Sequence, residues 1–310
     1  MRIAITGATG FVGHATLDAA LAKGARVRAL TRRAQHARER VEWVSGTLAD
    51  PQSLAELCRS AEAVIHIAGL TNTPDPAEFE TANVVGTENM INAAQAAGIK
   101  RFVFVSSLSA REPNLSAYGA SKARAETLVE ASGGSGGLDW TIVRPPAVYG
   151  PRDKDMFELF RSAKYGIVPV PPKGKTSIIH VEDLARLLVA LAIPSEASRL
   201  THRQIYEPWD DNAYGYDHGE LAKMIGEAVG NSQVLAPNVP EPLLQIGAKI
   251  DRALRGHKAK LTEDRIGYLV HPDWVCDLKK APPLSLWQAV WGGEDGLKMT
   301  AEWYKSEGWL

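Results

Sequence analysis

Short apolar runs alternate with alanine-rich segments of helical spacing along the first 150 residues. The apolar runs are expected to be β-strands, at residues 3–5, 27–30, 41–44, 63–67, 102–105 and 140–143. The segments expected to be helices cover residues 14–23, 53–59, 84–97 and 121–130. Strands that alternate with helices form parallel sheets, and continuous apolar strands indicate a sheet buried on both faces. The pattern therefore predicts an α/β protein with a doubly wound parallel sheet.

The pattern changes after Gly150. Residues 151–175 are rich in Pro, Lys and Gly, a helix-like segment begins near Val181, and the chain is irregular from about Ser232. We expect residues 1–150 to form the sheet domain, with about 176–208 returning to it. Residues 151–175 and about 209–310 are expected to form mainly a smaller C-terminal cap that binds the substrate.

Composition narrows the class of protein. The chain has 310 residues, with 35 Lys and Arg against 36 Asp and Glu. This balance argues against nucleic acid or an anionic membrane as a partner of the whole chain, although a local basic patch is present. Two cysteines, Cys58 and Cys276, are too few for a disulfide framework. Without a long apolar run or a leader, we expect a cytoplasmic protein.

The first strand runs into a glycine-rich turn, Thr6-Gly7-Ala8-Thr9-Gly10-Phe11-Val12-Gly13. Glycines allow a tight turn and let a diphosphate approach the bare backbone, while the following helix N-terminus offers free N–H groups. Alone, such a turn could be purely structural, but here it opens the first strand–helix–strand unit. The sequence therefore predicts a Rossmann fold that binds a dinucleotide through Gly7, Thr9, Gly10, Phe11, Val12 and Gly13.

The end of the second strand bears on the choice of dinucleotide. NAD-binding folds place Asp or Glu there, whereas this chain has Thr31-Arg32-Arg33. An arginine fork matches a 2′-phosphate in geometry and charge. We therefore expect NADP, with Arg32 as its main phosphate partner and NAD as the alternative. A solvated basic edge, or a nucleic-acid patch, is the other interpretation of these arginines.

Tyr118 and Lys122 have the i, i+4 spacing that stacks two side chains on one helix face. A neighbouring ammonium lowers a phenol pKa, so Tyr118 could exchange a proton while a nicotinamide exchanges a hydride. The preceding strand ends in Ser106-Ser107, at the sheet edge where ligands bind.

The ordered motifs resemble the extended short-chain dehydrogenase/reductases, the NAD(P)-dependent epimerase/dehydratase family. The motifs that carry the resemblance span nearly the whole chain, at residues 6–13, 66–69, 83–87, 105–107, 118–122, 144–151, 180–185 and 300–310.

The resemblance implies roles for individual residues. Tyr118 would be the acid/base, Lys122 would tune it and hold the nicotinamide ribose, Ser107 would polarise the carbonyl, and Asn83 would support the hydrogen-bond network. The further cofactor contacts that it implies are Thr47, Leu48, Ala68, Gly69, Val105, Ser106, Pro145, Ala147 and Val148. His66 and His180 are expected to be hydrogen-bonded scaffold residues, and no metal-ligand spacing is found.

Three departures from the family pattern bear on the substrate. Thr47 stands where an Asp usually contacts the adenine, and only ten residues separate Ser107 from Tyr118, which means less cover over the site. Lys173 and Lys175 replace an arginine that holds nucleotide-sugar phosphates. These departures favour a less charged carbonyl compound.

The sequence therefore predicts an oxidoreductase that transfers hydride between NADP and a small-molecule ketone, aldehyde or secondary alcohol by a Ser-Tyr-Lys mechanism. Two alternatives stay open. One is a nucleotide-sugar epimerase or dehydratase, and the other is a non-catalytic NADP(H)-binding sensor or assembly factor. A homodimer is expected from the resemblance.

Overall fold

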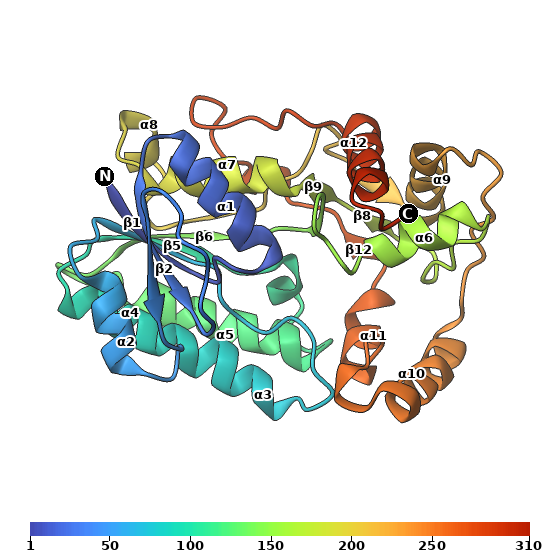
Figure 1. Ribbon diagram of the computed structural model, residues 1–310. Coiled ribbons are helices and arrows are strands. Elements are labelled where there is room, and N and C mark those ends of the chain that lie inside the picture. Colours follow the sequence, from blue (N-terminus) through green and yellow to red (C-terminus); the bar gives the residue numbers. More distant parts are fainter.

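The strands predicted from the first 150 residues lie in one parallel sheet of the computed structural model (Figure 1). The structure describes residues 1–310 except for the side chain of Lys258. Within the described chain the sheet order is β10-β6-β5-β4-β1-β2-β3. These strands are β1 (Arg2–Thr6), β2 (Arg26–Thr31), β3 (Val41–Ser45), β4 (Ala63–His66), β5 (Arg101–Val105), β6 (Asp139–Val143) and β10 (Gln204–Tyr206). The order reverses at β1 and β4, so a ligand crevice is expected at their carboxyl ends.

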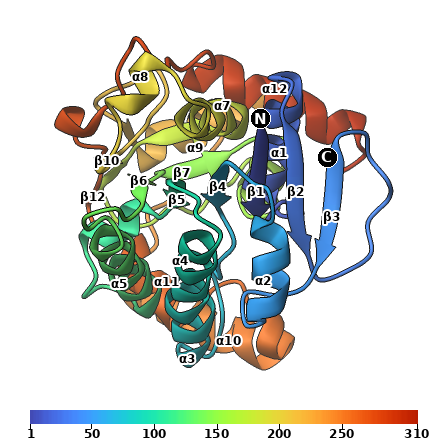
Figure 2. The same cartoon turned by 90° about the vertical axis from the view of Figure 1, so that its left-hand side faces the viewer.

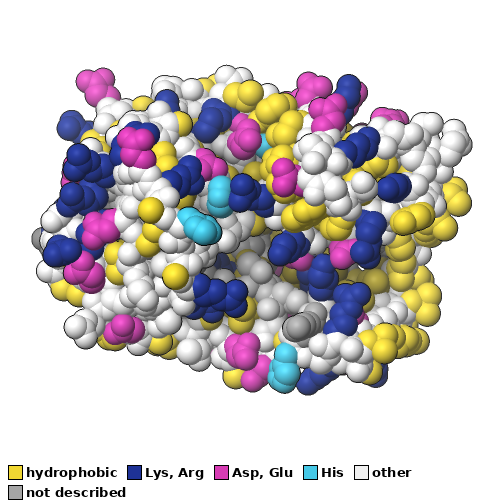
Figure 3. Space-filling view, viewed as in Figure 1, with side chains coloured by type: hydrophobic (Ala, Val, Ile, Leu, Met, Phe, Trp, Pro, Cys, Tyr) yellow, Lys and Arg dark blue, Asp and Glu magenta, His cyan; other side chains and the backbone are white. Residues whose placement is uncertain are grey.

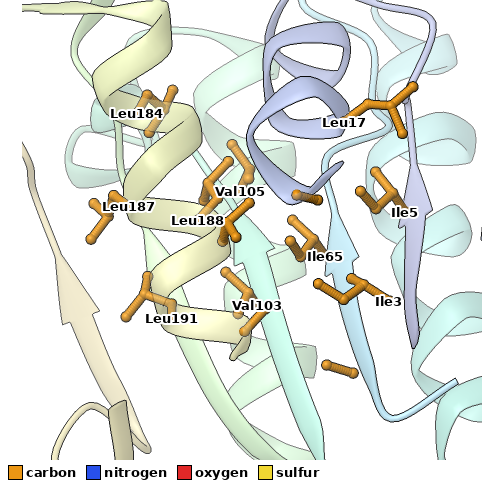
Figure 4. Close-up of a cluster of buried hydrophobic side chains, with 14 of the residues drawn as sticks. Ile3, Ile5, Leu17, Ile65, Val103, Val105, Leu184, Leu187, Leu188 and Leu191 are labelled. Atoms are coloured by element: carbon orange, nitrogen blue, oxygen red, sulfur yellow. The ribbon is translucent and has the colours of Figure 1, made fainter. Parts of the chain in front are cut away.

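Helices cover both faces of this sheet (Figure 2). α1 (Phe11–Ala22) and α7 (Val181–Ala192) cover one face, and α2 (Pro51–Cys58), α4 (Gly86–Ala96) and α5 (Ala117–Ala131) cover the other. Figure 4 shows leucines of α7 packed over Val103, Val105 and Ile65 of the sheet. The predicted doubly wound Rossmann fold is therefore confirmed.

Two helices begin earlier than the apolar spacing predicts. The helix expected at 121–130 begins at Ala117, because the Ser116 side chain caps it by accepting a hydrogen bond from the Gly119 N–H at 2.9 Å. The helix expected at 84–97 is preceded by α3 (Ala77–Phe79) and by a π-helical turn at Glu80–Val85. Both extensions bring polar residues to the sheet edge.

The remaining elements form a second layer beside the crevice, which we call the cap. Its helices are α6 (Phe157–Lys164), α9 (His218–Val229), α10 (Glu241–Arg255), α11 (Glu263–Leu269) and α12 (Gly293–Ser306). Its small sheet has the order β11 (Tyr216–Asp217), β8 (Lys175–Thr176) and β12 (Asp273–Trp274). Short elements complete the chain, namely η2 (Leu108–Arg111), β7 (Ala147–Tyr149), β9 (Ile178–His180), α8 (Glu196–Arg199), η3 (Gly256–Lys258) and η4 (Leu278–Lys280).

The expectation of an irregular chain beyond Ser232 is wrong, because α10, α11 and α12 lie there. Prolines and mixed charges hide the helical spacing. Pro242 lies in the first turn of α10, where a missing N–H costs nothing.

The cap has a core of its own, with Tyr149, Phe160, Ile225, Leu297 and Tyr304 among its buried residues. Both cysteines are buried and unpaired, as the sequence suggested. Among the described residues, no helix is long and apolar enough to cross a membrane.

Candidate active site

The glycine-rich turn packs too tightly to admit side chains. Gly7 has a φ of +74°, and a Cβ on Gly13 would lie 1.9 Å from the Gly7 carbonyl oxygen. Gly10 is the N-cap of α1 and has no side chain to cap it, so the first N–H groups of the helix are left without a side-chain partner. Thr9 is exposed, and Phe11 and Val12 are half-buried. A bare cradle at a helix N-terminus fits the diphosphate of a dinucleotide.

A hydrogen-bond network fixes the wall opposite this turn. The Thr6 hydroxyl accepts hydrogen bonds from the N–H groups of Ile67 and Ala68, both at 3.1 Å. His66 shares hydrogen bonds with Thr6 at 2.6 Å and Thr87 at 3.1 Å. Burial lowers the pKa of His66 to about 3, so the imidazole is neutral. The prediction that His66 is a hydrogen-bonded scaffold residue is confirmed.

His180 is the N-cap residue of α7. Its Nδ1 accepts a hydrogen bond from the Glu182 N–H at 3.3 Å, and its ring packs edge-on against Tyr149. Burial lowers its pKa to about 4. No cluster of residues suited to hold a metal ion occurs in the described part of the chain.

Asn83, in the π-helical turn, joins the loop after β4 to α5. Its amide accepts from the Leu70 N–H at 2.6 Å and donates to the Leu70 carbonyl and the Ser121 hydroxyl, both at 2.9 Å. Gly69 lies against it, since a Cβ there would be 2.9 Å from the Asn83 Oδ1. Asn83 therefore positions the loop beside the crevice.

Tyr118, Lys122 and Ser107 meet at the carboxyl end of β5. Tyr118 and Lys122 lie on the first turns of α5, and Tyr118 and Ser107 line the same cavity. Ser107 is also 2.8 Å from the Ser109 hydroxyl. The Lys122 ammonium donates to the Val105 carbonyl at 2.8 Å and lies 4.5 Å from the centre of the Phe104 ring.

The expected lowering of the Tyr118 pKa by Lys122 is absent from this structure. Burial raises the pKa of Tyr118 to about 12, against the lowering effect of the nearby Ser107 hydroxyl. Burial also lowers the pKa of Lys122 to about 8. The Lys122 ammonium is directed to the Val105 carbonyl, which explains why it contributes little to the phenol. Tyr118 is therefore protonated at neutral pH, which suits a proton donor.

Only some of the other expected cofactor contacts line the cavity beside Ser107. Pro145 and Ala147 line a cavity together with Ser107, while Val148 is half-buried in β7. The Ser106 hydroxyl is buried and has no hydrogen-bond partner among the described residues.

Arg32, Thr47 and Leu48 do not line this cavity. Arg32 follows β2, is exposed, and makes no ion pair with any residue that the structure describes. The Leu48 side chain packs against Gly86. Figure 3 shows Lys and Arg side chains gathered around the hollow at the middle of the molecule.

A cavity of about 330 Å³ leads from Ser107 and Tyr118 into the cap. Most of its lining is apolar, from α6, α9, α11 and residues 168–171. Sequence reasoning missed several polar or aromatic residues in this lining, namely Asp155, His218, Arg265, Tyr268 and Trp274. These residues lie in cap segments that contain no recognisable catalytic or binding motif. The sequence alone therefore gave no reason to single them out. Lys173 and Lys175 do not line the cavity.

The short connection between Ser107 and Tyr118 is covered by the cap. Arg111 donates to the carbonyls of Val275 at 2.7 Å and Asp273 at 3.0 Å. The Tyr268 ring lies 6.1 Å from the Tyr118 ring. Helix α11 and residues 273–275 therefore cover the part of the site that the short connection between Ser107 and Tyr118 leaves open.

Comparison with known proteins places these features in context. The family model described as "NAD dependent epimerase/dehydratase family" matches residues 3–201. The chain is 36% identical over 317 residues to a ceramide reductase of Caulobacter vibrioides, covering 99% of this chain and 96% of that protein. It is 32% identical over 338 residues to a 2-alkyl-3-oxoalkanoate reductase of Stenotrophomonas maltophilia, covering 99% and 92%. The solved structure of MoeE5 with UDP-glucuronic acid and NAD has a TM-score of 0.75 at 21% identity, with coverage of 99% and 100%.

Proposed function

Because this chain belongs to the NAD-dependent epimerase/dehydratase family, we propose that it is an NADP(H)-preferring reductase of a ketone carried on an apolar chain. Members of this family are NAD(P)-dependent enzymes. The observation that carries the substrate class is the apolar cavity that opens beside Ser107 and Tyr118.

In this proposal the chain holds the ketone by its oxygen. Ser107 and Tyr118 both donate hydrogen bonds to it, and Tyr118, protonated at neutral pH, gives it the proton that completes the alcohol. Lys122 and Asn83 fix the geometry of this end of α5. The bound nicotinamide supplies the hydride to the carbonyl carbon.

The crevice residues would hold the cofactor. The Gly7–Gly13 turn fits the diphosphate, and Arg32, exposed and without an ion-pair partner among the described residues, would meet a 2′-phosphate. Thr47 and Leu48 would flank the adenine, Ala68 and Gly69 the ribose and diphosphate, and Val105, Ser106, Pro145, Ala147 and Val148 the nicotinamide half.

The nature of the cavity supports an apolar substrate over a nucleotide sugar. A sugar nucleotide carries two phosphates that need cationic partners, yet Arg265 is the only lysine or arginine among the described residues lining the cavity. Apolar residues such as Leu159, Val168, Val170 and Ile225 suit an alkyl or acyl chain. The two reductases named above, for a ceramide and for a 2-alkyl-3-oxoalkanoate, are consistent with this class.

The test is NADPH oxidation with long-chain 3-oxo compounds, with UDP-glucose as the comparison. We expect stoichiometric NADPH oxidation with the ketones. Tyr118→Phe should lower kcat by roughly 100-fold or more while an NADPH-induced rise in melting temperature persists. The control Tyr165→Phe, at an exposed tyrosine, should keep full activity.

Two results would contradict the proposal. Turnover of UDP-glucose without net NADPH consumption would show an epimerase. NADPH binding by the wild type with no turnover of any ketone would indicate a sensor.

A further inference from the structure

Helix α10 directs its apolar residues away from the protein. Leu243, Ile246, Ile250 and Leu254 are between 54% and 80% exposed. Their spacing places them along one stripe of the helix, whereas Ala248 is its buried residue. A helix at the surface of a folded protein normally shows the opposite arrangement, with the apolar stripe facing the core.

Basic residues lie on the same helix. Lys249, Arg252 and Arg255 are exposed, and the helical spacing places Lys249 beside the stripe and Arg252 on the opposite side. The nearby Asp251 is engaged within the protein, because it accepts hydrogen bonds from the N–H groups of Lys260 and Leu261 and pairs with Arg255. Because Asp251 and Arg255 pair with each other, Lys249 and Arg252 are the basic residues of α10 without an ion-pair partner among the described residues, against the acidic Glu241 in its first turn.

The exposed apolar surface extends beyond α10. Leu235 lies in the segment that leads to it and is paired with Ile167 in a β-bridge, and both side chains are exposed. Figure 3 shows hydrophobic side chains along the right-hand edge and lower right of the view, where this segment and α10 lie in Figure 1. A patch of this kind marks a binding surface rather than scattered apolar residues.

This surface adjoins the element that closes the active-site cavity. After α10 and the short η3 comes α11, which supplies Arg265, Tyr268 and Leu269 to the cavity lining. Gly247 of α10 faces Leu261, which precedes α11, since a Cβ on Gly247 would lie 3.4 Å from the Leu261 side chain. Whatever binds α10 is therefore held next to the cap wall of the cavity.

We propose that α10 docks in the plane of an anionic phospholipid surface. The stripe would enter the region between head groups and acyl chains, and the positive charges of Lys249 and Arg252 would attract the phosphates. An amphipathic helix with unpaired basic residues on its polar surface has the charge that complements such a surface. The nearly neutral net charge of the whole chain predicts no membrane partner. Binding to a surface depends on the residues that contact it, however, and at α10 these are apolar and basic. The inference goes beyond the proposed function and requires no catalysis.

The test is co-sedimentation of the full chain with vesicles of phosphatidylcholine, with and without phosphatidylglycerol. We expect binding to the mixed vesicles that weakens with added salt. Ile246→Glu with Ile250→Glu should lower the bound fraction about 10-fold or more, since both charges would enter the apolar layer. The matched control, Leu200→Glu with Leu284→Glu, changes exposed leucines elsewhere and should bind as wild type does.

A second pair of substitutions tests the role of the basic residues. Lys249→Gln with Arg252→Gln should reduce binding to mixed vesicles and leave binding to phosphatidylcholine alone unchanged. Each variant should still reduce a short, water-soluble ketone, which separates failure of docking from failure of the proposed function.

Three outcomes would overturn the proposal. Wild type could ignore both kinds of vesicle, or the Ile246/Ile250 variant could bind as tightly as its control. Light scattering could also show that the wild type is an oligomer, that the Ile246/Ile250 variant is a monomer, and that vesicles bind neither. In that case a second copy of the chain covers α10.

Discussion

The carboxylate of Asp264 accepts a hydrogen bond from the backbone N–H of Tyr118 at 3.3 Å, and it also accepts one from the preceding N–H of Ala117. Asp264 belongs to α11 of the cap, whereas Tyr118 lies on the first turn of α5. A helix N-terminus leaves N–H groups without intrahelical partners and favours a negative charge. The cap therefore takes part in fixing the residue that we propose as the proton donor.

Replacing Asp264 with Ala should loosen this connection. We expect a loss of about 1 kcal/mol in the free energy of unfolding, as for other lost helix caps, and a higher KM for the ketone with a smaller change in kcat. Asp264→Asn keeps an oxygen that can accept a hydrogen bond, so its unfolding free energy and its KM should lie between those of the wild type and of Asp264→Ala. The exposed neighbour Glu263 provides the control, because Glu263→Ala should change neither property. An unaltered KM in Asp264→Ala would count against a positioning role.

Arg32→Ala should weaken NADPH more than NADH. A lost charge-assisted hydrogen bond is worth about 1.5–3 kcal/mol, so kcat/KM for NADPH should fall roughly 10- to 150-fold with little change for NADH. Melting temperature with each cofactor gives an independent measure, and Arg59→Ala, at an exposed arginine remote from the crevice, is the control. A larger melting shift of the wild type with NADH than with NADPH would refute the assignment.

Ala222→Leu should shorten the substrate chain that the enzyme accepts. Ala222 lines the cavity from α9, and three added carbons would occupy space that an alkyl chain needs. One methylene is worth about 1–3 kcal/mol in such a pocket, so kcat/KM should fall about 10-fold or more for long-chain ketones and stay unchanged for short ones. Ala228→Leu, on the same helix and outside the lining, is the control. An equal loss for all chain lengths would contradict this use of the cavity.

His66 should make the fold sensitive to acid. Its pKa is about 3 in the folded protein against 6.5 when unperturbed, so the unfolded chain takes up the proton first. Stability should therefore fall as the pH drops below 6.5, by about 2 kcal/mol at about pH 5 for this residue. Urea unfolding at about pH 7 and pH 5 measures the loss.

The variant His66→Gln should show a smaller loss between these two pH values, whatever its stability at neutral pH. His36→Gln changes an exposed histidine and should keep the full loss. Identical pH dependence in wild type and His66→Gln would exclude His66 as the cause.

Local signals in the sequence were sufficient for the sheet domain and one side of the site. The alternation of apolar strands with helices predicted the parallel sheet, because a strand buried on both faces carries mostly apolar residues. The turn from Gly7 to Gly13 and the Tyr118–Lys122 spacing are short-range patterns, so each could be found from neighbouring residues. The rule that ligands bind at the carboxyl edge of a parallel sheet placed Ser107 there, the family resemblance implied Tyr118 as its partner, and both line one cavity in the structure.

The cap and the electrostatics of the site were decided by tertiary structure. Three features depend on how distant segments pack together, which no local sequence pattern encodes. They are the apolar cavity, the contact of Asp264 with Tyr118 and the outward apolar stripe of α10. The raised pKa of Tyr118 has the same origin. The i, i+4 spacing alone predicted Lys122 beside the Tyr118 phenol. The pKa values of both groups are determined instead by burial and by the Val105 carbonyl that binds the ammonium, and both depend on how distant segments fold together.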